Sequence, residues 1–434
     1  MSTPLPATVW LLVGLSFGLA VQLPWRITTA AWPVHVPKAA AQALSAYLVV
    51  AGLVGGTLAA ALFVRRPSVG MALAGVLGVT AALLSHWYLQ QIRAPNDALS
   101  AAFGRGWQEQ LPTQARAGML EGRRRWALPG GAVPRWERDV VYAKVPETDV
   151  ELRADVWQPP AGVEPSGLGL IYVHGGSYAM GAKDFGTRPA FRHLARQGHV
   201  ITDINYRLVD DTDIFGMVAD VKRAIIWLKD HTATYGVNPD RIVVAGASAG
   251  GNLALLAAYT PGHPLTTPDE VVADTSVRAA VSFYGVHDWP AFGRLSSGDD
   301  LAVRLLGGEL EDMPQRYAAA SPVTHVGPDT PATLLIQGLH DQTHLIDANR
   351  KLAAWLSHNG ARVATVELAA TASTSCRRGS VASRRPRSPR CMTSSASSPC
   401  SPTTPADRAD TGAQRLPPRP GAHRPGRRPQ GAVR

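Results

Sequence analysis

The chain has 434 residues, more than one ordinary domain needs, and a formal net charge of +10. The positive charge is concentrated at one end, because residues 369–434 contain 13 Arg, no Lys and 2 Asp. This segment has no aromatic residue on which a base could stack, so we expect no nucleic-acid partner. All three cysteines (Cys376, Cys391 and Cys400) lie in it, which excludes a disulfide framework, a thiolate nucleophile or a cysteine metal site in the preceding residues.

Three uncharged apolar runs open the chain, at Ala7–Trp25, Ala39–Val64 and Ser68–Gln90. About 20 apolar residues cross the hydrocarbon core of a bilayer as a helix. Trp10 and Trp87 stand where interfacial aromatic side chains are expected. The sequence therefore predicts a multi-pass membrane anchor of three helices over residues 1–92.

The orientation of the predicted anchor is weakly encoded. Arg65 and Arg66 in the second turn favour that turn on the cytoplasmic side, which places the following domain outside. Arg26, Lys38 and Arg93 argue the other way. The balance leans slightly to an extracytoplasmic domain and leaves the side open.

Residues 93–133 are polar and predict a juxtamembrane linker; after Pro134 strands and helices alternate. Alternation of this kind predicts an α/β domain with a mostly parallel sheet and helices on both faces, over residues 134–368. The expected strands are Asp139–Val145, Glu151–Trp157, Leu168–Val173, His199–Asn205, Arg241–Ala245, Ala279–Tyr284, Ala332–Gln337 and Val363–Leu368. The expected helices are Phe185–Gln197, Phe215–Tyr235, Ala249–Tyr259 and Leu345–Asn359.

A serine stands at the junction of a strand and a helix, in the pentapeptide GASAG. Ser248 is flanked by Gly246 and Gly250, as in the G-x-S-x-G turn that raises a nucleophilic hydroxyl above the sheet edge. The helix that follows directs its amides and the positive end of its dipole at the same place. Ser248 is therefore the candidate nucleophile.

The segment "YVHGGSYAMG" begins at Tyr172 and follows another expected strand. Here His174 precedes Gly175 and Gly176, whose amides can point at an oxygen that becomes negative during acyl transfer. The amide of Ala249, next to the nucleophile, is the third expected donor. Asp341, in "GLHD" just past the strand Ala332–Gln337, is the candidate acid that would orient a histidine.

These motifs resemble the α/β-hydrolase fold, and within it the hormone-sensitive-lipase-like carboxylesterases, including forms attached to bacterial membranes. The matching segments are "HGGSY", "NYRL" from Asn205, "NPDRIVVAGASAGGNLAL" from Asn238, "SPVTHV" from Ser321 and "GLHD" from Gly338. The resemblance covers about residues 140–368. It implies the same roles for Ser248, Asp341 and the three amides. "NYRL" departs from the commoner "DYRL", and we interpret its Arg207 as structural.

The catalytic base is missing from its expected place. In this family the histidine follows one strand after the acid, but no histidine comes soon after Leu368. Those after Asp341 are His344 and His358, in or beside a helix, and His423, in "RPGAHRPG". His340 and His287 are out of order along the chain, although His287 could line the pocket.

A shift of reading frame accounts for the missing base. Residues 370–375 can be encoded by codons that, read one base earlier, give Gly-His-Gly-Phe-Asp-Leu. In the same frame "CMTSSASS", from Cys391, permits Leu-His-Asp-Val-Val-Ser-Glu-Phe, an amphipathic final helix. We expect the basic segment 369–434 to be disordered and the product of such a shift.

The sequence as a whole predicts a membrane-anchored serine carboxylesterase that hydrolyses small to medium acyl esters through an acyl-enzyme. Residues 288–324, including Trp289, are expected to form a cap over the pocket. Neither a metal nor a cofactor is expected. Two alternatives stay open: a catalytically inactive α/β-hydrolase that serves as a membrane-tethered binding domain, and an amidase or formamidase on the same site. Oligomeric state and acyl length stay open too.

Overall fold

The computed structural model describes residues 5–25, 32–91, 96–118, 132–146, 148–267, 273–293, 300–341 and 343–368. The predicted disordered segment 369–434, and His423 with it, lies outside these ranges. So do residues 119–131 of the predicted linker.

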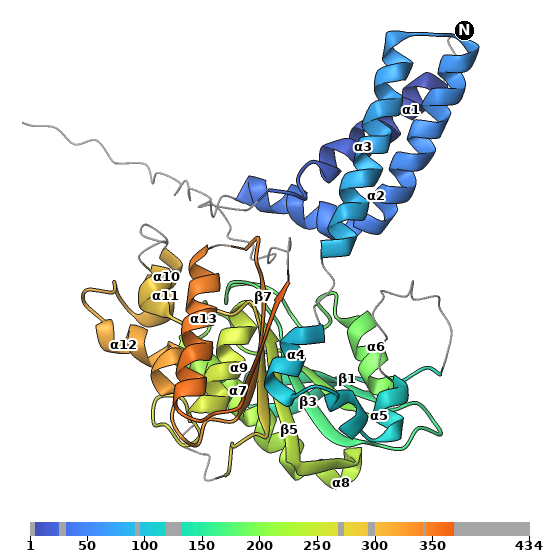
Figure 1. Cartoon of the computed structure of the whole chain (residues 1–434). Coiled ribbons are helices and arrows are strands. Elements are labelled where there is room, and N and C mark those ends of the chain that lie inside the picture. Colours follow the sequence, from blue (N-terminus) through green and yellow to red (C-terminus); the bar gives the residue numbers. More distant parts are fainter. Residues whose placement is uncertain are drawn as a thin grey trace, which may run out of the picture. The chain divides into compact units, whose positions relative to one another are not determined.

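Three apolar helices pack against one another at the start of the chain: α1 (Leu5–Ala20), α2 (Trp32–Arg65) and α3 (Val69–Gln91) (Figure 1). Two of them are long and apolar enough to cross a membrane, namely residues 44–65 of α2 and the whole of α3. Helix α1 has 16 residues and so extends about 24 Å, less than a hydrocarbon core. The length expected of a membrane span is thus met by two of the three predicted segments.

Helices α2 and α3 approach closely through glycine. A Cβ atom on Gly78 would lie 2.7 Å from both the carbonyl oxygen of Gly52 and the amide nitrogen of Gly56. Only residues without a side chain permit this separation, and such contacts are common between helices in lipid. The hydroxyls of Thr57 and Thr80 donate to the carbonyls four residues earlier, both at 2.8 Å, which satisfies them without water.

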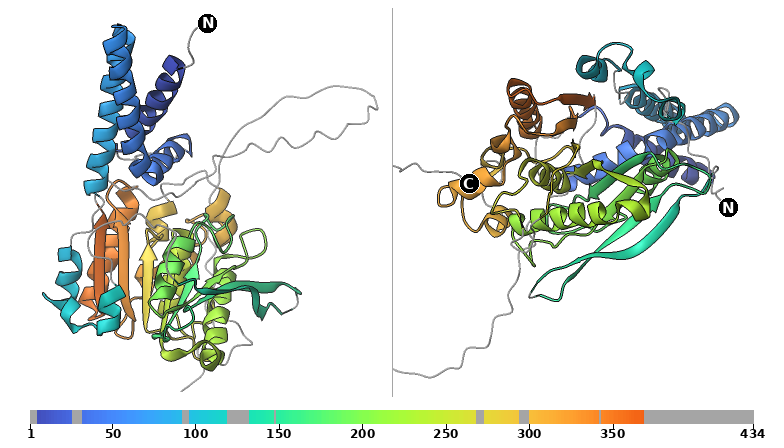
Figure 2. Two further views of the ribbon diagram at one scale, coloured as in Figure 1. Left: turned by 90° about the vertical axis from the view of Figure 1, so that its right-hand side faces the viewer. Right: turned by 90° about the horizontal axis from the view of Figure 1, so that it is seen from below.

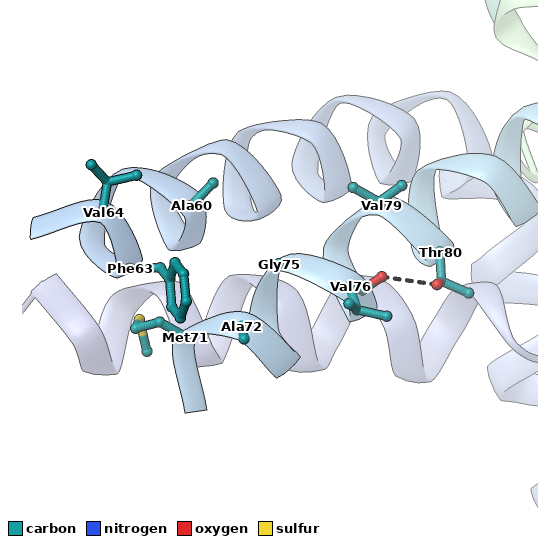
Figure 3. A pocket seen from close by; sticks show the side chains of 9 residues that line it. All are labelled: Ala60, Phe63, Val64, Met71, Ala72, Gly75, Val76, Val79 and Thr80. Carbon is teal, nitrogen blue, oxygen red and sulfur yellow. Dashed lines mark hydrogen bonds between the residues drawn. The ribbon is translucent and has the colours of Figure 1, made fainter. Parts of the chain in front are cut away.

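A shallow apolar groove of about 440 Å³ lies between α2 and α3 near their turn (Figure 3). Figure 3 shows that Thr80 uses its hydroxyl on the Val76 carbonyl, so the groove presents almost no polar group. Val64 and Val69 beside it are 80% and 87% exposed. Apolar side chains this exposed, on successive turns of long helices, are typical of a surface that contacts lipid.

The predicted linker contains short helices: α4 (Asn96–Phe103), η1 (Trp107–Gln110) and α5 (Thr113–Gly118). Helix α4 lies beside the last strand of the sheet, β8 (Val363–Leu368). The expectation of a plain linker is therefore too simple for this part of residues 93–133.

The α/β domain has a single eight-stranded sheet in the order β1-β2-β4-β3-β5-β6-β7-β8. Strands β1 and β2 pair antiparallel and form a ribbon at one edge (Figure 2), β2 pairs antiparallel with β4, and the other pairs are parallel. The prediction of a mostly parallel sheet is confirmed. The remaining strands are β1 (Arg135–Lys144), β2 (Glu151–Gln158), β3 (Gly167–Val173), β4 (Val200–Ile204), β5 (Val237–Ala247), β6 (Ala279–Phe283) and β7 (Ala332–Gly338).

Helices cover both faces of the sheet (Figure 1). On one face α7 (Ile214–Asp230), α9 (Ala249–Tyr259) and α13 (Thr343–His358) pack on the strands. Buried side chains such as Ile171, Val244 and Leu335 fill that core. On the other face α6 (Arg188–Arg196) places Phe191 against Trp157 and Ile201.

The long helix expected over Phe215–Tyr235 is interrupted. Helix α7 ends at Asp230, and His231 leads into the single turn α8 (Thr232–Tyr235). The His231 ring nitrogen Nδ1 contacts the Trp227 carbonyl at 2.7 Å, and its amide bonds the carbonyls of Trp227 and Leu228. The break lies in the backbone of His231, whose φ of −106° and ψ of 15° depart from helical values, and the ring contact with Trp227 accompanies it. The region expected to be a cap contains α10 (Trp289–Gly293), α11 (Asp300–Leu306), α12 (Pro314–Ala319) and η2 (Pro322–His325).

Candidate active site

Ser248 stands at the sharp turn between β5 and α9, as the sequence predicts. It has φ 55° and ψ −119°, a conformation that costs energy for a residue with a side chain. Its amide donates to the Phe283 carbonyl at 2.8 Å, which fixes the turn against β6. The Ser248 side chain is half-buried, so its hydroxyl remains reachable from solvent.

The two flanking glycines are required by backbone contacts. A Cβ atom on Gly250 would lie 2.1 Å from the Val173 carbonyl oxygen, and one on Gly246 would lie 2.1 Å from the Gly250 carbonyl oxygen. Real atoms do not approach so closely, and the atoms in the way are main chain. The small residues around Ser248 therefore follow from the tightness of the turn.

The loop after β3 brings Gly175 next to the serine. A Cβ atom on Gly175 would lie 3.3 Å from the Ser248 Cβ, and Gly176 has φ 135°, which favours glycine. Among the described residues, no acceptor takes a hydrogen bond from the amides of Gly175 or Gly176. Both amides are thus available, close to Ser248, for an oxygen that gains negative charge. Ala249, the third predicted donor, is the first residue of α9.

His174 holds this loop and does not act as a base. Its ring stacks on Tyr206 at 4.5 Å between centroids, and its Nδ1 contacts the Gly175 carbonyl oxygen at 2.8 Å. Tyr206 donates its hydroxyl to the His174 carbonyl at 3.1 Å. Burial lowers the pKa of His174 to about 4, so the ring stays neutral near pH 7.

Asp341 lies where parallel strands end, two strands from Ser248 in the sheet order. The side chain is 2% exposed and accepts a hydrogen bond from Gln337 Nε2 at 2.8 Å. The Leu339 amide donates to the Leu368 carbonyl at 2.9 Å, so the chain leaves β8 beside the turn that carries Asp341. A residue soon after Leu368 is therefore well placed to meet the acid.

Two of the other histidines considered from the sequence are placed where they do not serve as the base. His287 is fully buried, with Nε2 3.0 Å from the Ser282 hydroxyl, and burial lowers its pKa to about 3. His358 is exposed and lies edge-on to Trp355. His340 is half-buried in the turn that carries Asp341, and the side chain of His344 lies outside the described residues.

Tyr178 and Trp289 form an aromatic wall behind the site, and the sequence predicts only Trp289 as part of it. Tyr178, at φ 60°, donates its hydroxyl to Asn252 Oδ1 at 3.1 Å, and its ring lies 5.6 Å from that of Trp289. Trp289 is 1% exposed, so it belongs to the core beneath the cap region. Asn252 also donates to the carbonyls of Val286 and Ala320. No sequence motif marks Asn252, because its partners are distant along the chain.

Arg207 forms two 2.9 Å hydrogen bonds to Asp220, as its structural interpretation predicts.

Comparison with known proteins agrees with this arrangement. Residues 154–356 match the BD-FAE family model. The chain is 38% identical over 197 residues to the probable carboxylic ester hydrolase LipM of Mycobacterium tuberculosis, covering 43% of this chain and 44% of LipM. It is 31% identical over 225 residues to the esterase LipQ of the same organism, covering 50% and 51%. The chain thus spans about half the length of the curated relatives it matches.

A solved structure, a truncated carbohydrate esterase from gut microbiota, superposes with a TM-score of 0.50 at 20% identity. The superposition covers 56% of this chain and 90% of that one, and it supports the fold alone. The strand order, the serine turn and the relatives agree with the motifs quoted above. The α/β domain of this chain therefore has the α/β-hydrolase fold, and its sequence is similar to that of the esterases LipM and LipQ.

Proposed function

We propose that the protein is a membrane-anchored serine carboxylesterase acting on esters of small to medium acyl chains. The observation that carries this proposal is the position of Ser248, on a strained turn, beside the two available amides of Gly175 and Gly176. Acyl transfer needs this combination of a nucleophile and preorganised donors. The names of LipM and LipQ point to the same chemistry.

In the proposed reaction the Ser248 oxygen attacks the ester carbonyl carbon, and the carbonyl oxygen becomes negative against the amides of Gly175, Gly176 and Ala249. Collapse of this intermediate expels the alcohol and leaves an acyl-serine. Water then attacks the acyl carbon and releases the acid. A base must take the serine proton and later protonate the leaving alcohol.

We assign the base to a histidine encoded one frame away, just after β8, where Asp341 would orient it. The main-chain hydrogen bond between Leu339 and Leu368 supports this assignment, because it brings the end of β8 to the turn that carries Asp341. The chain with the given sequence, which lacks this histidine and is called the written chain below, would then be an impaired enzyme. The direct test is to resequence the gene across codons 360–400. A miscounted base should restore a histidine near position 370, and an unchanged reading would remove the assignment.

The inactive binding domain remains a second candidate, favoured by one observation: no histidine stands between positions 358 and 423 in the written sequence. A fluorophosphonate probe separates the two candidates, because it labels only an activated serine. Labelling that disappears in Ser248→Ala supports the esterase. Absence of labelling in the chain with the restored reading frame, with intact fold by circular dichroism, supports the binding domain, whereas absence in the written chain is expected of both candidates because that chain has no base. A matched panel of esters and amides then tests the specificity of an active protein.

The membrane anchoring is supported by two helices of sufficient length and by their exposed apolar surface. We expect the full chain to remain in the membrane fraction after alkaline carbonate washing. Release into the supernatant would contradict integral insertion. A cysteine introduced at the exposed Asp329, in a chain whose three native cysteines are replaced by serine, would report the side of the hydrolase domain when it is probed with an impermeant maleimide in intact cells and in lysates.

A further inference from the structure

The loop that carries Gly175 and Gly176 is fixed at its far end by polar groups of the sheet. The Lys183 amide donates to Asn205 Oδ1 at 2.6 Å, and the Asp184 amide donates to Asp203 Oδ2 at 2.6 Å. Asp203 lies in β4 and Asn205 directly follows that strand. The loop therefore has two adjacent amides clamped by two side chains from the end of one strand.

A buried carboxylate on the neighbouring strand β2 adds to this clamp. Asp155 pairs with Asp203 across β2 and β4, and the two are 0% and 1% exposed. Asp155 forms an ion pair with Lys183 at 2.6 Å. It also accepts hydrogen bonds from Trp136 Nε1 at 3.1 Å and from the Asp139 amide at 3.0 Å. Asp155 is thus fully engaged.

Asp203 is not engaged to the same extent. Its Oδ1 is buried without a hydrogen-bond partner among the described residues, which also place no cation within 4.0 Å of this carboxyl group. The charged groups around it come from several elements: Asp155 on β2, Asp139 on β1, and Lys183, Asp184 and Arg188 on the loop and α6. Burial, followed by the nearby carboxylates of Asp155 and Asp184, raises the pKa of Asp203 to about 7.

We propose that Asp203 and Asn205 are positioning residues that hold the oxyanion loop closed, by accepting hydrogen bonds from the amides of Asp184 and Lys183. Each fixes a backbone group seven to nine residues after Gly175 and Gly176, and so limits how far these donors can move away from Ser248. This inference deepens the proposed function and rests on it for the role of the loop. The clamp itself stands on the contacts given above.

The clamp makes loop opening dependent on pH. Opening of the loop exposes Asp203 to water, where its carboxyl group has an ordinary pKa near 3.9. Between about pH 4 and pH 7, opening therefore releases a proton and becomes more favourable as the pH rises. Above pH 7 Asp203 is ionised in both forms, so the dependence ends. Asn205 carries no charge, and it adds nothing to this dependence.

Hydrogen exchange of the full chain, followed by mass spectrometry, tests the clamp without requiring catalysis. After correction for intrinsic exchange rates, opening measured on residues 175–186 should increase at least tenfold from pH 5 to pH 7. The Asp203→Asn variant keeps an acceptor and removes the titration, so its profile should be flat. Asp230→Asn, an exposed carboxylate on α7, is the matched control and should keep the pH dependence.

The Asn205 part of the clamp is tested in the same way. Asn205→Ala should raise exchange of residues 175–186 about tenfold at every pH and leave the peptides of β5 and α9 unchanged. Asn205→Asp keeps the acceptor and should restore protection at low pH. Unchanged loop exchange in Asn205→Ala together with a pH-dependent Asp203→Asn would overturn the proposal. Should Asn205→Ala fail to fold, the Asp203→Asn profile alone decides.

The rate of Ser248 labelling by a fluorophosphonate links the clamp to the site, and it is measured in the chain with the restored reading frame, because the written chain has no base to activate the serine. We expect Asn205→Ala to lower this rate at least fivefold, because the phosphonyl oxygen uses the same amides. An unchanged rate despite faster exchange would show that the loop does not position the donors. If Ser248 is labelled in no variant, the proposed esterase fails, whereas the exchange data still decide the clamp.

Discussion

The two sides of the candidate site are built differently. The nucleophile side (β3, β5 and α9, with Gly175 and Ser248) is held by main-chain contacts of residues near the serine or on the adjacent strands. On the acid side (β7, β8 and α13, with Asp341), Gln337 Oε1 and both amide atoms of Asn349 are buried without a hydrogen-bond partner among the described residues. Buried polar groups are normally satisfied. The comparison teaches that the turn around Ser248 is fixed by main-chain contacts within the described residues, whereas the polar side chains next to Asp341 have room for hydrogen bonds to further atoms.

Restoring the reading frame should cause the largest change in activity, because it adds the histidine that the acid side is expected to orient. A chain with the expected histidine after Leu368 should hydrolyse a p-nitrophenyl acyl ester on the order of 10⁶-fold faster than the written chain, since removal of the histidine base from a catalytic triad costs about that much. Initial rates for the two purified chains provide the measurement. The restored chain with Ser248→Ala is the control for hydrolysis elsewhere. Equal rates for the two chains would contradict the assignment of the base.

Substitution of the acid, Asp341, should have different effects in the restored chain and in the written chain. Asp341→Asn should lower the rate of the restored chain by about 10³- to 10⁴-fold, because the histidine loses its orienting carboxylate. In the written chain the same change should leave the residual rate within about twofold. A large loss in the written chain would mean that another residue already works with Asp341.

One added methyl group at Gly250 should disrupt the close main-chain packing of the nucleophile side. Gly250→Ala places a Cβ 2.1 Å from the Val173 carbonyl oxygen, and neither main-chain group can move without displacing β3. We expect a loss of about 3 kcal/mol or more in the free energy of unfolding, measured by chemical denaturation. Gly327→Ala is the matched control, since nothing lies within 4 Å of its added Cβ, and it should be nearly neutral.

The nucleophile side was predictable because its signal is local. Ser248, Gly246 and Gly250 are consecutive or nearly so, and a tight turn allows few residue types. The loop clamp was not predictable, because Lys183 and Asn205 meet only after β3 and β4 have paired. The same holds for Asn252, whose three partners lie 34 to 74 residues away. The break in the helix at His231 lies in its backbone conformation, which periodicity does not encode.

At the start of the chain, hydropathy identified the apolar segments but overestimated the first one. The residues after Ala20 leave the helix as a turn, where Lys38 Nζ donates to the carbonyls of Gln22 and Leu23 at 3.2 and 3.0 Å. A lysine from the next helix therefore holds the turn that follows α1, and this contact cannot be read from hydropathy. The helices of the predicted linker have only four to eight residues each, too few for periodicity to identify them.

Strand β6 lies between the two sides, and its Ser282 holds the buried His287. With a folded-state pKa of about 3, this ring stays neutral in the folded protein while it takes up a proton in the unfolded chain below pH 6.5. Its contribution to stability is therefore present above pH 6.5 and is lost as the pH falls toward 3. Between pH 7 and pH 5 the loss should be about 2 kcal/mol, measured by urea unfolding. His287→Gln should remove this part of the slope, whereas exposed His358→Gln should retain it.

The smallest effect is expected at the aromatic wall of the nucleophile side. Tyr178→Phe removes one hydroxyl and leaves Asn252 Oδ1 without its donor, while Asn252 keeps its bonds to the carbonyls of Val286 and Ala320. One neutral buried hydrogen bond contributes about 1 kcal/mol, so the midpoint of urea unfolding should fall slightly with an unchanged slope. Tyr47→Phe, on the exposed surface of α2, is the control. A loss above about 3 kcal/mol would mean that the hydroxyl also supports the positive φ of Tyr178, and the nucleophile side would then depend on side-chain as well as main-chain contacts.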